Sequence, residues 1–231
     1  MDTTMDDGGD HELERRGDGG WAAGDHARIA TDLTGPLGAA LAAAAGVGPG
    51  DRVLDVVGGG YSALPHPDAA FDVVLSCMGV VAPHHRRAAG ELVRVCRGGG
   101  TIGMLAWAAD GLAAAIVRTV TPYTPHGAHT PAPRCVVLPE LLGDRVVDVR
   151  VRRGAVTTDR YPTPEAWRDH WKDGYGPVAA VYRHLEPDPE EVAALDRDLA
   201  SVATRFDCGT AATVLRWDYV VVTARRAEQW R

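Results

Sequence analysis

The fold is decided by the stretch Asp51-Arg52-Val53-Leu54-Asp55-Val56-Val57-Gly58-Gly59-Gly60. Its apolar, β-branched run predicts a buried parallel strand over Val53 to Val57 that feeds a glycine turn. In dinucleotide-binding α/β domains a helix opens right after such glycines, and the next strand ends in an acid that holds a ribose about 20 residues on. Here Tyr61 to Asp68 leads directly to the next apolar strand, Phe71 to Cys77. The sequence therefore lacks both the helix and the acidic residue.

The following segments extend this pattern into an α/β domain. We expect a helix over Ala82 to Cys96, a helix stop and turn over Arg97 to Gly100, and a third core strand over Ile102 to Trp107. The core strands lack polar residues except at their ends, as strands covered by helices on both faces do. Because ligands of open α/β sheets bind beyond the carboxyl ends of the strands, Ser76 to Gly79 and Ala106 to Ala108 should face a site.

Several of these segments together carry a resemblance to a known family. The matching pieces, which reach from before the first strand to the third, are Gly48 to Val56, Ala63 to Pro65, Pro67 to Val74, Ala88 to Gly100 and Thr101 to Trp107. With Trp21 to Leu33 and the downstream half, they make most of the chain resemble class I S-adenosylmethionine (SAM) dependent methyltransferases of the small-molecule type. The resemblance implies a truncated doubly wound, Rossmann-like α/β sheet with an α-helical lid.

The same resemblance implies that a unit has been lost. In that family an acid-small-Gly-x-Gly turn is followed by helix, strand, acidic residue, helix and strand, so this chain lacks one to one and a half βαβ units, roughly 30 to 50 residues. Most of the SAM-binding half would then be deleted, and we expect no cofactor. Asp55 keeps the position of the first-strand acid, and we interpret it as a buried, hydrogen-bonded carboxylate. Gly58 to Gly60 either cradles a ligand or, as we favour, is a flexible splice across the lost segment.

Composition restricts the function classes. The 231 residues are enough for one α/β domain with additions. A net charge of -7 and a pI near 5.7 argue against nucleic-acid binding, which needs a basic face. The four cysteines form no C-x-x-C pair, which favours a reducing compartment and argues against structural zinc or disulfides. Because no membrane-length apolar run or export signal is found, we expect a cytoplasmic protein that binds no membrane.

The remaining segments predict a tail and a lid. Residues 1–20 are acidic and glycine-rich with almost no apolar side chains, which predicts a disordered tail. The helical spacing from Ile29 to Leu41, interrupted at Gly35-Pro36, predicts two helices. We therefore expect a single methyltransferase-like domain over 21–231, divided into N-terminal lid helices (21–45), a core sheet (46–160 and 207–231) and a helical lid (161–206).

Downstream of the third strand, helices alternate with a long loop and two strands. Thr163 and Pro164 begin a helix in the style of a capping box. The other expected elements are a helix over Gly111 to Val120, an irregular loop over Thr121 to Arg134, a helical turn over Pro139 to Leu142, a strand over Val146 to Arg152, a helix over Pro189 to Phe206 and a strand over Trp217 to Ala224. The loop is either a lid or a solvated connector.

Polar and aromatic side chains gather where the resembled family binds substrate. We predict Asp25 and His126 as catalytic residues, since a carboxylate or a histidine of near-neutral pKa suits proton transfer. The predicted substrate-binding residues are Trp21, His26, Met78, His84, Trp107, Tyr123, His129, Trp171 and Tyr175. For most of the aromatic residues the alternative role is packing in the core. His84 to Arg87 either binds an anion or forms a solvated cap, and His126 with His129 gives only a weak metal signal.

Three functions remain open from the sequence: a methyltransferase with an unusual cofactor pocket, a SAM-independent enzyme that keeps the substrate cavity, and a noncatalytic subunit. We favour the second, because the polar side chains of four residues are concentrated where the resembled family binds substrate: Asp25, His84, His126 and His129. An intramolecular displacement needs the same alignment as methyl transfer, without the donor. By analogy with methyltransferase relatives that act as cyclases in natural-product pathways, we expect an amine to displace a neighbouring sulfate, or a similar anion, and form an aziridine. Asp25 or a lid histidine would accept the ammonium proton, and histidine and arginine side chains would stabilise the anion.

The missing unit also predicts a partner. In the resembled family the lost strands lie outside the first strand, so Val53 to Val57 becomes an apolar edge of the sheet. We expect a second copy of the chain, or a separate protein subunit, to cover this edge. The substrate is expected to be a small molecule, free or carrier-bound.

Overall fold

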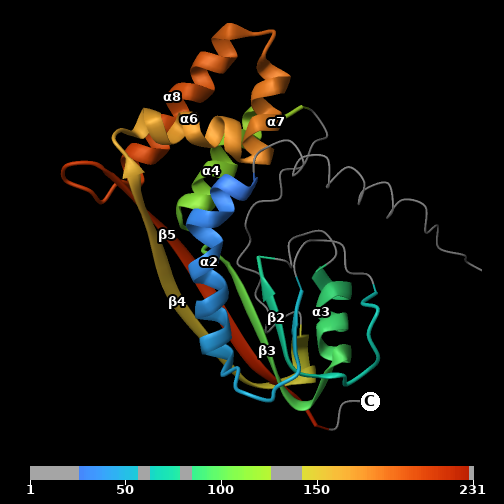
Figure 1. Cartoon of the computed structure of the whole chain (residues 1–231). Coiled ribbons are helices and arrows are strands. Elements are labelled where there is room, and N and C mark those ends of the chain that lie inside the picture. The colour runs from blue at the N-terminus through green and yellow to red at the C-terminus, as the bar shows by residue number, and fades with distance from the viewer. Residues whose placement is uncertain (1–25, 57–62, 79–84, 126–141, 229–231) are drawn as a thin grey trace, which may run out of the picture.

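A five-stranded sheet runs through the molecule, with helices on both faces and a helical cap at one end (Figure 1). The computed structural model describes residues 26–56, 63–78, 85–125 and 142–228. Its elements are α2 (His26–Ala45), β1 (Val53–Asp55), β2 (Phe71–Cys77), α3 (His85–Val95), β3 (Cys96–Trp107), α4 (Leu112–Val120), η1 (Thr121–Tyr123), η2 (Gly143–Arg145), β4 (Val146–Tyr161), α6 (Pro164–Gly174), α7 (Gly176–Leu185), α8 (Pro189–Phe206) and β5 (Thr213–Arg226).

Some sequence predictions lie outside the described ranges: those on the tail 1–20, on Gly58 to Gly60 and on most of the loop and turn between 126 and 141. None of the helices in the described part of the chain has the length and apolar character that a membrane span requires.

The order of the strands is β1-β2-β3-β5-β4. Strands β1, β2 and β3 run parallel, and β5 lies antiparallel between β3 and β4. Val53 faces Val73, so β1 pairs directly with β2 and lies at an edge of the described sheet. The Rossmann-like α/β architecture is confirmed, as is the direct succession of the first two core strands.

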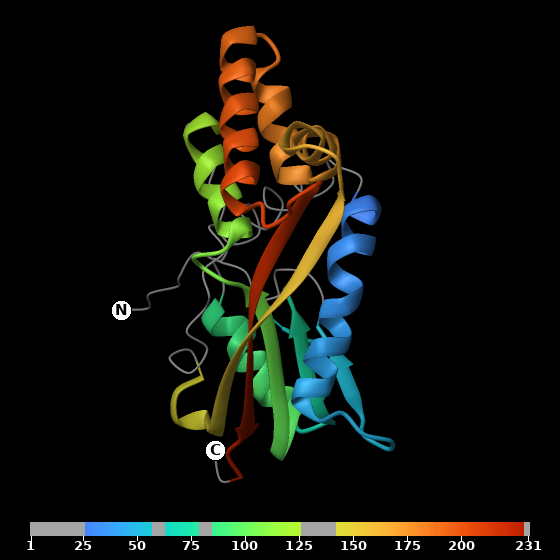
Figure 2. The same ribbon diagram turned by 90° about the vertical axis from the view of Figure 1, so that its left-hand side faces the viewer.

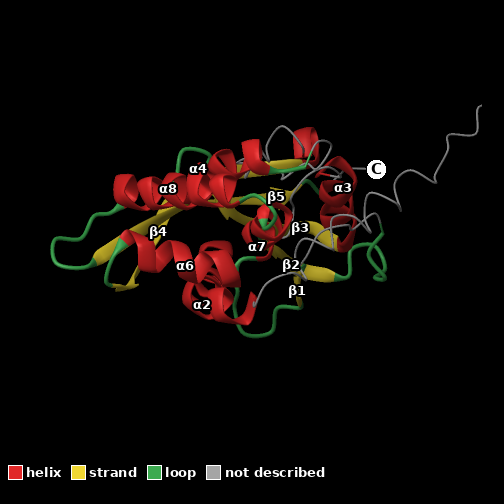
Figure 3. Ribbon diagram, turned by 90° about the horizontal axis from the view of Figure 1, so that it is seen from above, coloured by secondary structure: helices red, strands yellow, loops and turns green. Residues whose placement is uncertain are grey.

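The two faces of the sheet have separate cores (Figure 3). On one face α2 buries Leu37 and Leu41 against Val73, Leu75 and Leu105. On the other face α3 buries a second set, Ala89, Leu92 and Val93, against Val74 of β2 and Cys96 and Ile102 of β3. Both faces of β2 and β3 are therefore covered, which explains their nearly unbroken apolar sequences.

The N-terminal segment forms one helix, and the predicted break at Gly35-Pro36 is wrong. α2 continues from His26 to Ala45 with Pro36 inside it. A proline removes one backbone hydrogen bond and crowds the preceding turn. That loss is offset because Leu33, Leu37 and Leu41, four residues apart, are all at most 3% exposed and bind the helix to the core on both sides of the proline.

The glycine segment after α3 does not separate helix from strand as predicted. β3 begins already at Cys96, and Phe71 faces Cys96 while Val73 faces Thr101, so β3 accommodates three extra residues opposite β2. Gly99 has a positive φ of 68° within this irregularity. A Cβ on Gly100 would lie 2.7 Å from the carbonyl oxygen of Asp72, so only glycine allows the close approach.

Strands β4 and β5 are much longer than predicted, since they reach beyond the parallel sheet to carry the cap (Figure 2). The cap has its own core, in which Trp167, Leu195, Leu199, Leu215 and Trp217 are at most 1% exposed. Helices α4, α6, α7 and α8 all contribute to it. The predicted start of α6 is confirmed, because the Thr163 side chain accepts a hydrogen bond from Ala166 N and Pro164 follows in the first turn.

A clamp on α3 holds the connection between β1 and β2. Leu64 N donates to Glu91 Oε2 over 2.6 Å, and Arg94 donates to the carbonyl oxygens of Leu64 (3.0 Å) and His66 (2.7 Å). Glu91 and Arg94 also bind each other at 2.7 Å through two pairs of atoms, and Arg94 pairs with Asp68 at 2.8 Å. The two helix residues thus supply the backbone partners that a regular element would otherwise provide.

Glu91→Ala should lower the free energy of unfolding at pH 7 by about 2 kcal/mol, because Leu64 N–H loses its acceptor and Arg94 its main partner. The matched control is Asp68→Ala, which also removes a partner of Arg94. The Asp68 side chain is 78% exposed against 15% for Glu91, so the control should change stability by less than about 0.5 kcal/mol. Urea unfolding measures both, and equal losses would contradict the clamp.

The same pair predicts a pH dependence. Hydrogen bonds from Arg94 hold the pKa of Glu91 below its usual range. A lowered folded-state pKa stabilises the fold above the unfolded-state value of about 4.3, and this contribution is lost as the pH falls through the folded-state pKa. The difference between wild type and Glu91→Ala should therefore shrink when unfolding is repeated below pH 4.

Candidate functional site

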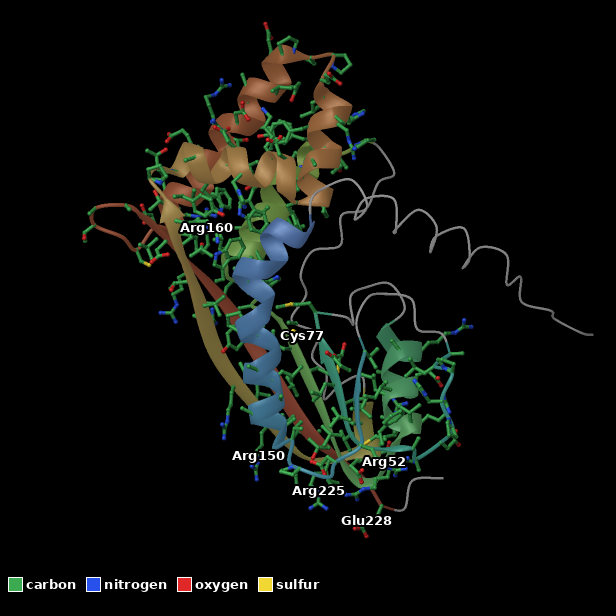
Figure 4. The ribbon with its side chains drawn as sticks, in the orientation of Figure 1. Arg52, Cys77, Arg150, Arg160, Arg225 and Glu228 are labelled. Carbon is green, nitrogen blue, oxygen red and sulfur yellow. The ribbon has the colours of Figure 1, made fainter. Side chains whose placement is uncertain are left out.

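The carboxyl ends of β1, β2 and β3 meet beneath the cap, where ligands of open α/β sheets bind. Cys77 ends β2 and is labelled at this point in Figure 4. Met78 follows with a φ of 56°, which is uncommon for a residue other than glycine, and its N–H donates to Leu105 O over 2.9 Å. Backbone in sparsely populated regions clusters at functional sites when the surrounding structure enforces it. Met78 is thus held at the position predicted for a substrate-binding residue.

Asp55 and Cys77, which end β1 and β2, interact electrostatically. Burial, and then the negative charge of Asp55, raise the pKa of the Cys77 thiol to about 11. The thiol is therefore protonated at neutral pH and is no activated nucleophile. Asp55 itself is exposed, so its interpretation as a buried carboxylate is wrong, although partial desolvation still raises its pKa. The short β1 ends at Asp55 and leaves this side chain at the rim of the sheet.

An aromatic stack joins the end of the sheet to the cap. Trp217 on β5 stacks on Trp171 of α6, with ring centroids 4.8 Å apart and planes 23° apart. Trp107, at the end of β3, lies 5.7 Å from Trp217, and Tyr175 lies 5.0 Å from Trp171. Trp167 extends the stack from the other side of Trp171 at 5.7 Å. Trp107 packs against both the cap core and the sheet core, so the stack spans the junction between them.

The local sequence explains how the stack forms. Trp167, Trp171 and Tyr175 follow one another at intervals of four residues, which places them on one face of α6 and its C-terminal end. The Trp217 indole N–H donates to Thr158 Oγ1 over 3.1 Å and so fixes the ring between the two sides. Trp171 and Trp217 are at most 5% exposed, while Trp107 and Tyr175 are half-buried at the ends of the stack. Desolvation raises the pKa of the Tyr175 hydroxyl to about 12, so it stays protonated.

The predicted site residues divide into three groups. Trp107, Trp171 and Tyr175 come together in the stack, through Trp217. Tyr123 lies apart on η1, where its hydroxyl donates to Asp198 of α8 over 2.7 Å, and its pKa is raised to about 12. Met78, like Trp107, packs against the sheet core. The third group lies outside the described residues or side chains: Trp21, Asp25, His84, His126 and His129 fall in undescribed ranges, and His26 begins α2 without a described side chain.

Trp217 was missed by the sequence interpretation, which treated it as the first residue of the last strand. The only available signal was a tryptophan at the boundary of an apolar strand, and that pattern is shared by many core residues. The described segments contain no group of three or more histidine, cysteine or acidic residues that could bind a metal ion.

Comparison with known proteins gives one family match. Residues 26–104 match the model of a family described as "Methyltransferase domain". The uncharacterized protein Rv1405c of Mycobacterium tuberculosis (strain ATCC 25618 / H37Rv) is 34% identical, over 89% of this chain and 92% of its own length. Rv1403c of the same strain is likewise 34% identical over the same shares. The alignment with Rv1405c spans 256 positions but covers 89% of 231 residues, so the relative has about 50 residues without a counterpart here.

Solved structures share the fold at low identity. BH2331 of Bacillus halodurans C-125, a protein assigned as a methyltransferase, is 15% identical with a TM-score of 0.48, over 82% of this chain and 98% of its own. The [4+2]-cyclase SpnF is 20% identical with a TM-score of 0.38, over 73% and 55% of the two chains. These likenesses carry no argument about activity.

Asp55→Asn should speed the alkylation of Cys77 by iodoacetamide severalfold between pH 8 and 10. Removing the negative charge lowers the thiol pKa, which raises the thiolate fraction at a given pH. Asp51→Asn is the control, because Asp51 precedes the opposite end of β1. Peptide-resolved mass spectrometry separates Cys77 from the other cysteines. Equal rates in both variants would contradict the coupling.

Proposed function

The chain belongs to the methyltransferase-domain family, and from this membership we propose that it is an enzyme of that fold that acts without SAM and closes a ring by intramolecular displacement. The amine of the substrate attacks a neighbouring carbon, the bond from that carbon to a sulfate or similar anionic group breaks, and the group leaves with the electron pair. The proton of the resulting ammonium passes to a base. The product is an aziridine.

The observation that carries the SAM-independent part is the end of the sheet at β1. In the resembled methyltransferases the ribose acid comes from a strand beyond the first one, and in the described residues no strand lies beyond β1. Only fifteen residues (56–70) connect β1 to β2. The excess of about 50 residues in the mycobacterial relatives supports a loss of one unit in this chain. Both observations support the proposal that the chain does not hold the ribose of SAM.

The substrate side of the fold, in contrast, has an aromatic surface. Trp107, at the carboxyl end of β3, and Tyr175, at the C-terminal end of α6, are half-buried at the ends of the stack. Aromatic faces attract cations and stack on flat groups, so this surface suits a substrate that carries an amine and an aromatic substituent. A dry site would also strengthen the interaction with the departing anion. As base we keep the sequence prediction, Asp25 or His126.

Calorimetry tests the loss of the cofactor. Titration of the full chain with SAM and with S-adenosylhomocysteine should show no binding at micromolar concentrations, because the sequence predicts neither the ribose acid nor a helix that opens after the glycines. The same preparation should unfold cooperatively on heating, which shows that the protein is folded. Micromolar affinity for either compound would contradict the proposal and favour a divergent methyltransferase.

Vicinal amino sulfate esters test the reaction, with 2-aminoethyl sulfate and an aryl-substituted analogue as probes. The protein should release sulfate from both esters, measured by ion chromatography, with a higher kcat/KM for the aryl analogue. Trp107→Ala should reduce kcat/KM for that analogue about tenfold, the equivalent of one lost stacking contact. Asp25→Ala or His126→Ala should reduce turnover while the exposed control His184→Ala should not. If the protein releases no sulfate from either ester, the result would favour a noncatalytic subunit.

A further inference from the structure

The two edges of the sheet expose very different surfaces. β1 has three residues, and its exposed large apolar side chain is Val53 at 37%. β4 has sixteen residues and pairs with β5 alone within the described sheet. It exposes Val147 (48%), Val149 (39%) and Val151 (61%). A very short edge strand is a common protection against pairing with other strands, whereas a long edge with apolar side chains is open to it. The partner predicted at β1 stays a prediction, and the larger unpaired surface lies on β4.

The β4 edge also carries positive charge. β4 and β5 together contain seven arginines and three aspartates, in a chain of net charge -7. Arg150 and Arg152 face Thr223 and Val221 of β5, two residues apart, so they lie on the same side of the sheet. Neither forms a hydrogen bond or ion pair with another described residue, and both are exposed, Arg150 projecting away from the ribbon in Figure 4.

The side chains along the β4 edge determine which sequence could pair with it as an added strand. Opposite Arg150 and Arg152 it would carry acidic residues at alternate positions, because directly opposed cross-strand residues share a side of the sheet. The residue between them would be apolar and lie beside Val151. Peptides that extend a sheet in this way gain affinity from backbone hydrogen bonds and specificity from the alternate side chains.

The chain itself contains such a pattern in Asp10-His11-Glu12-Leu13-Glu14. We propose that this acidic segment binds along the edge of β4, with its carboxylates on Arg150 and Arg152 and Leu13 beside Val151. The segment covers the exposed valines and offsets the charge of the β4–β5 ribbon. The residues 1–20 around it contain seven acidic residues and two arginines, so the sign of the charge fits along its length.

The chain is long enough for this contact. Arg152 lines one shallow groove with Ala40 and Ala44 of α2, so it lies 14 to 18 residues along the helix from His26, about 27 Å at 1.5 Å per residue. The twelve steps from Glu14 to His26 span up to about 40 Å when extended. Because the segment is tethered, its effective concentration is of millimolar order, and weak cross-strand pairs suffice to keep it bound.

Hydrogen exchange of the full chain tests the contact. The β4 amides that do not pair with β5, between residues 147 and 153, should be protected in the wild type. E12R/E14R should raise their exchange rates at least tenfold, and so should R150E/R152E. Combining all four substitutions restores opposite charges and should return the rates to within about threefold of wild type. D6R/D7R is the matched control, with the same change of charge outside the alternating segment, and should leave the rates unchanged.

Three outcomes would overturn the proposal. The first is that the β4 amides exchange equally fast in wild type and in E12R/E14R. The second is that D6R/D7R raises the exchange rates of the β4 amides as much as E12R/E14R does. The protection would then come from the overall negative charge of residues 1–20 and not from pairing of the segment 10–14. The third is protection that increases with protein concentration, which would assign the contact to a second copy.

Discussion

The parallel pairing of β1 with β2 is the constraint on which the rest of the structure depends. Parallel neighbours need a crossover of a dozen or more residues, usually a helix, and here fifteen residues (56–70) connect them. The described half of that connection is held by Glu91 and Arg94, whose side chains bind the backbone at Leu64 and His66. Helix α3 thus acts both as a cover of the sheet and as the support of its shortened edge.

The two sides of the described sheet differ in what they offer a ligand. The family pattern uses the first strand and its successors for the cofactor, but β1 has three residues and ends in an exposed aspartate. The long strands β4 and β5 lie at the other side and carry the cap, together with Trp217 of the aromatic stack. The aromatic stack joins the end of β3 to the cap, and this is the surface that we propose for the substrate.

Much of the fold could be predicted, because strongly apolar strands and capped helices are local signals. The strands 71–77 and 102–107, the cap at Thr163 and the helix 189–206 were found where expected. The predictions that were wrong concern elements whose extent is set by tertiary contacts. Pro36 stays helical because leucines on both sides of it are buried, and β4 and β5 are lengthened by the cap that they carry. For the site, Trp107, Trp171 and Tyr175 were predicted as aromatic residues of the substrate pocket, whereas Trp217 joins them only through the packing of the cap on β5.

The two edges of the described sheet limit pairing with other strands in different ways. At β1 the strand is so short that few backbone groups and one large apolar side chain are exposed. At β4 the length required to support the cap creates the opposite situation, since sixteen residues cannot be hidden by shortening. Arginines at alternate positions discourage pairing with most strands and select for acidic ones. An edge of this kind is selective because it repels basic segments and attracts acidic ones.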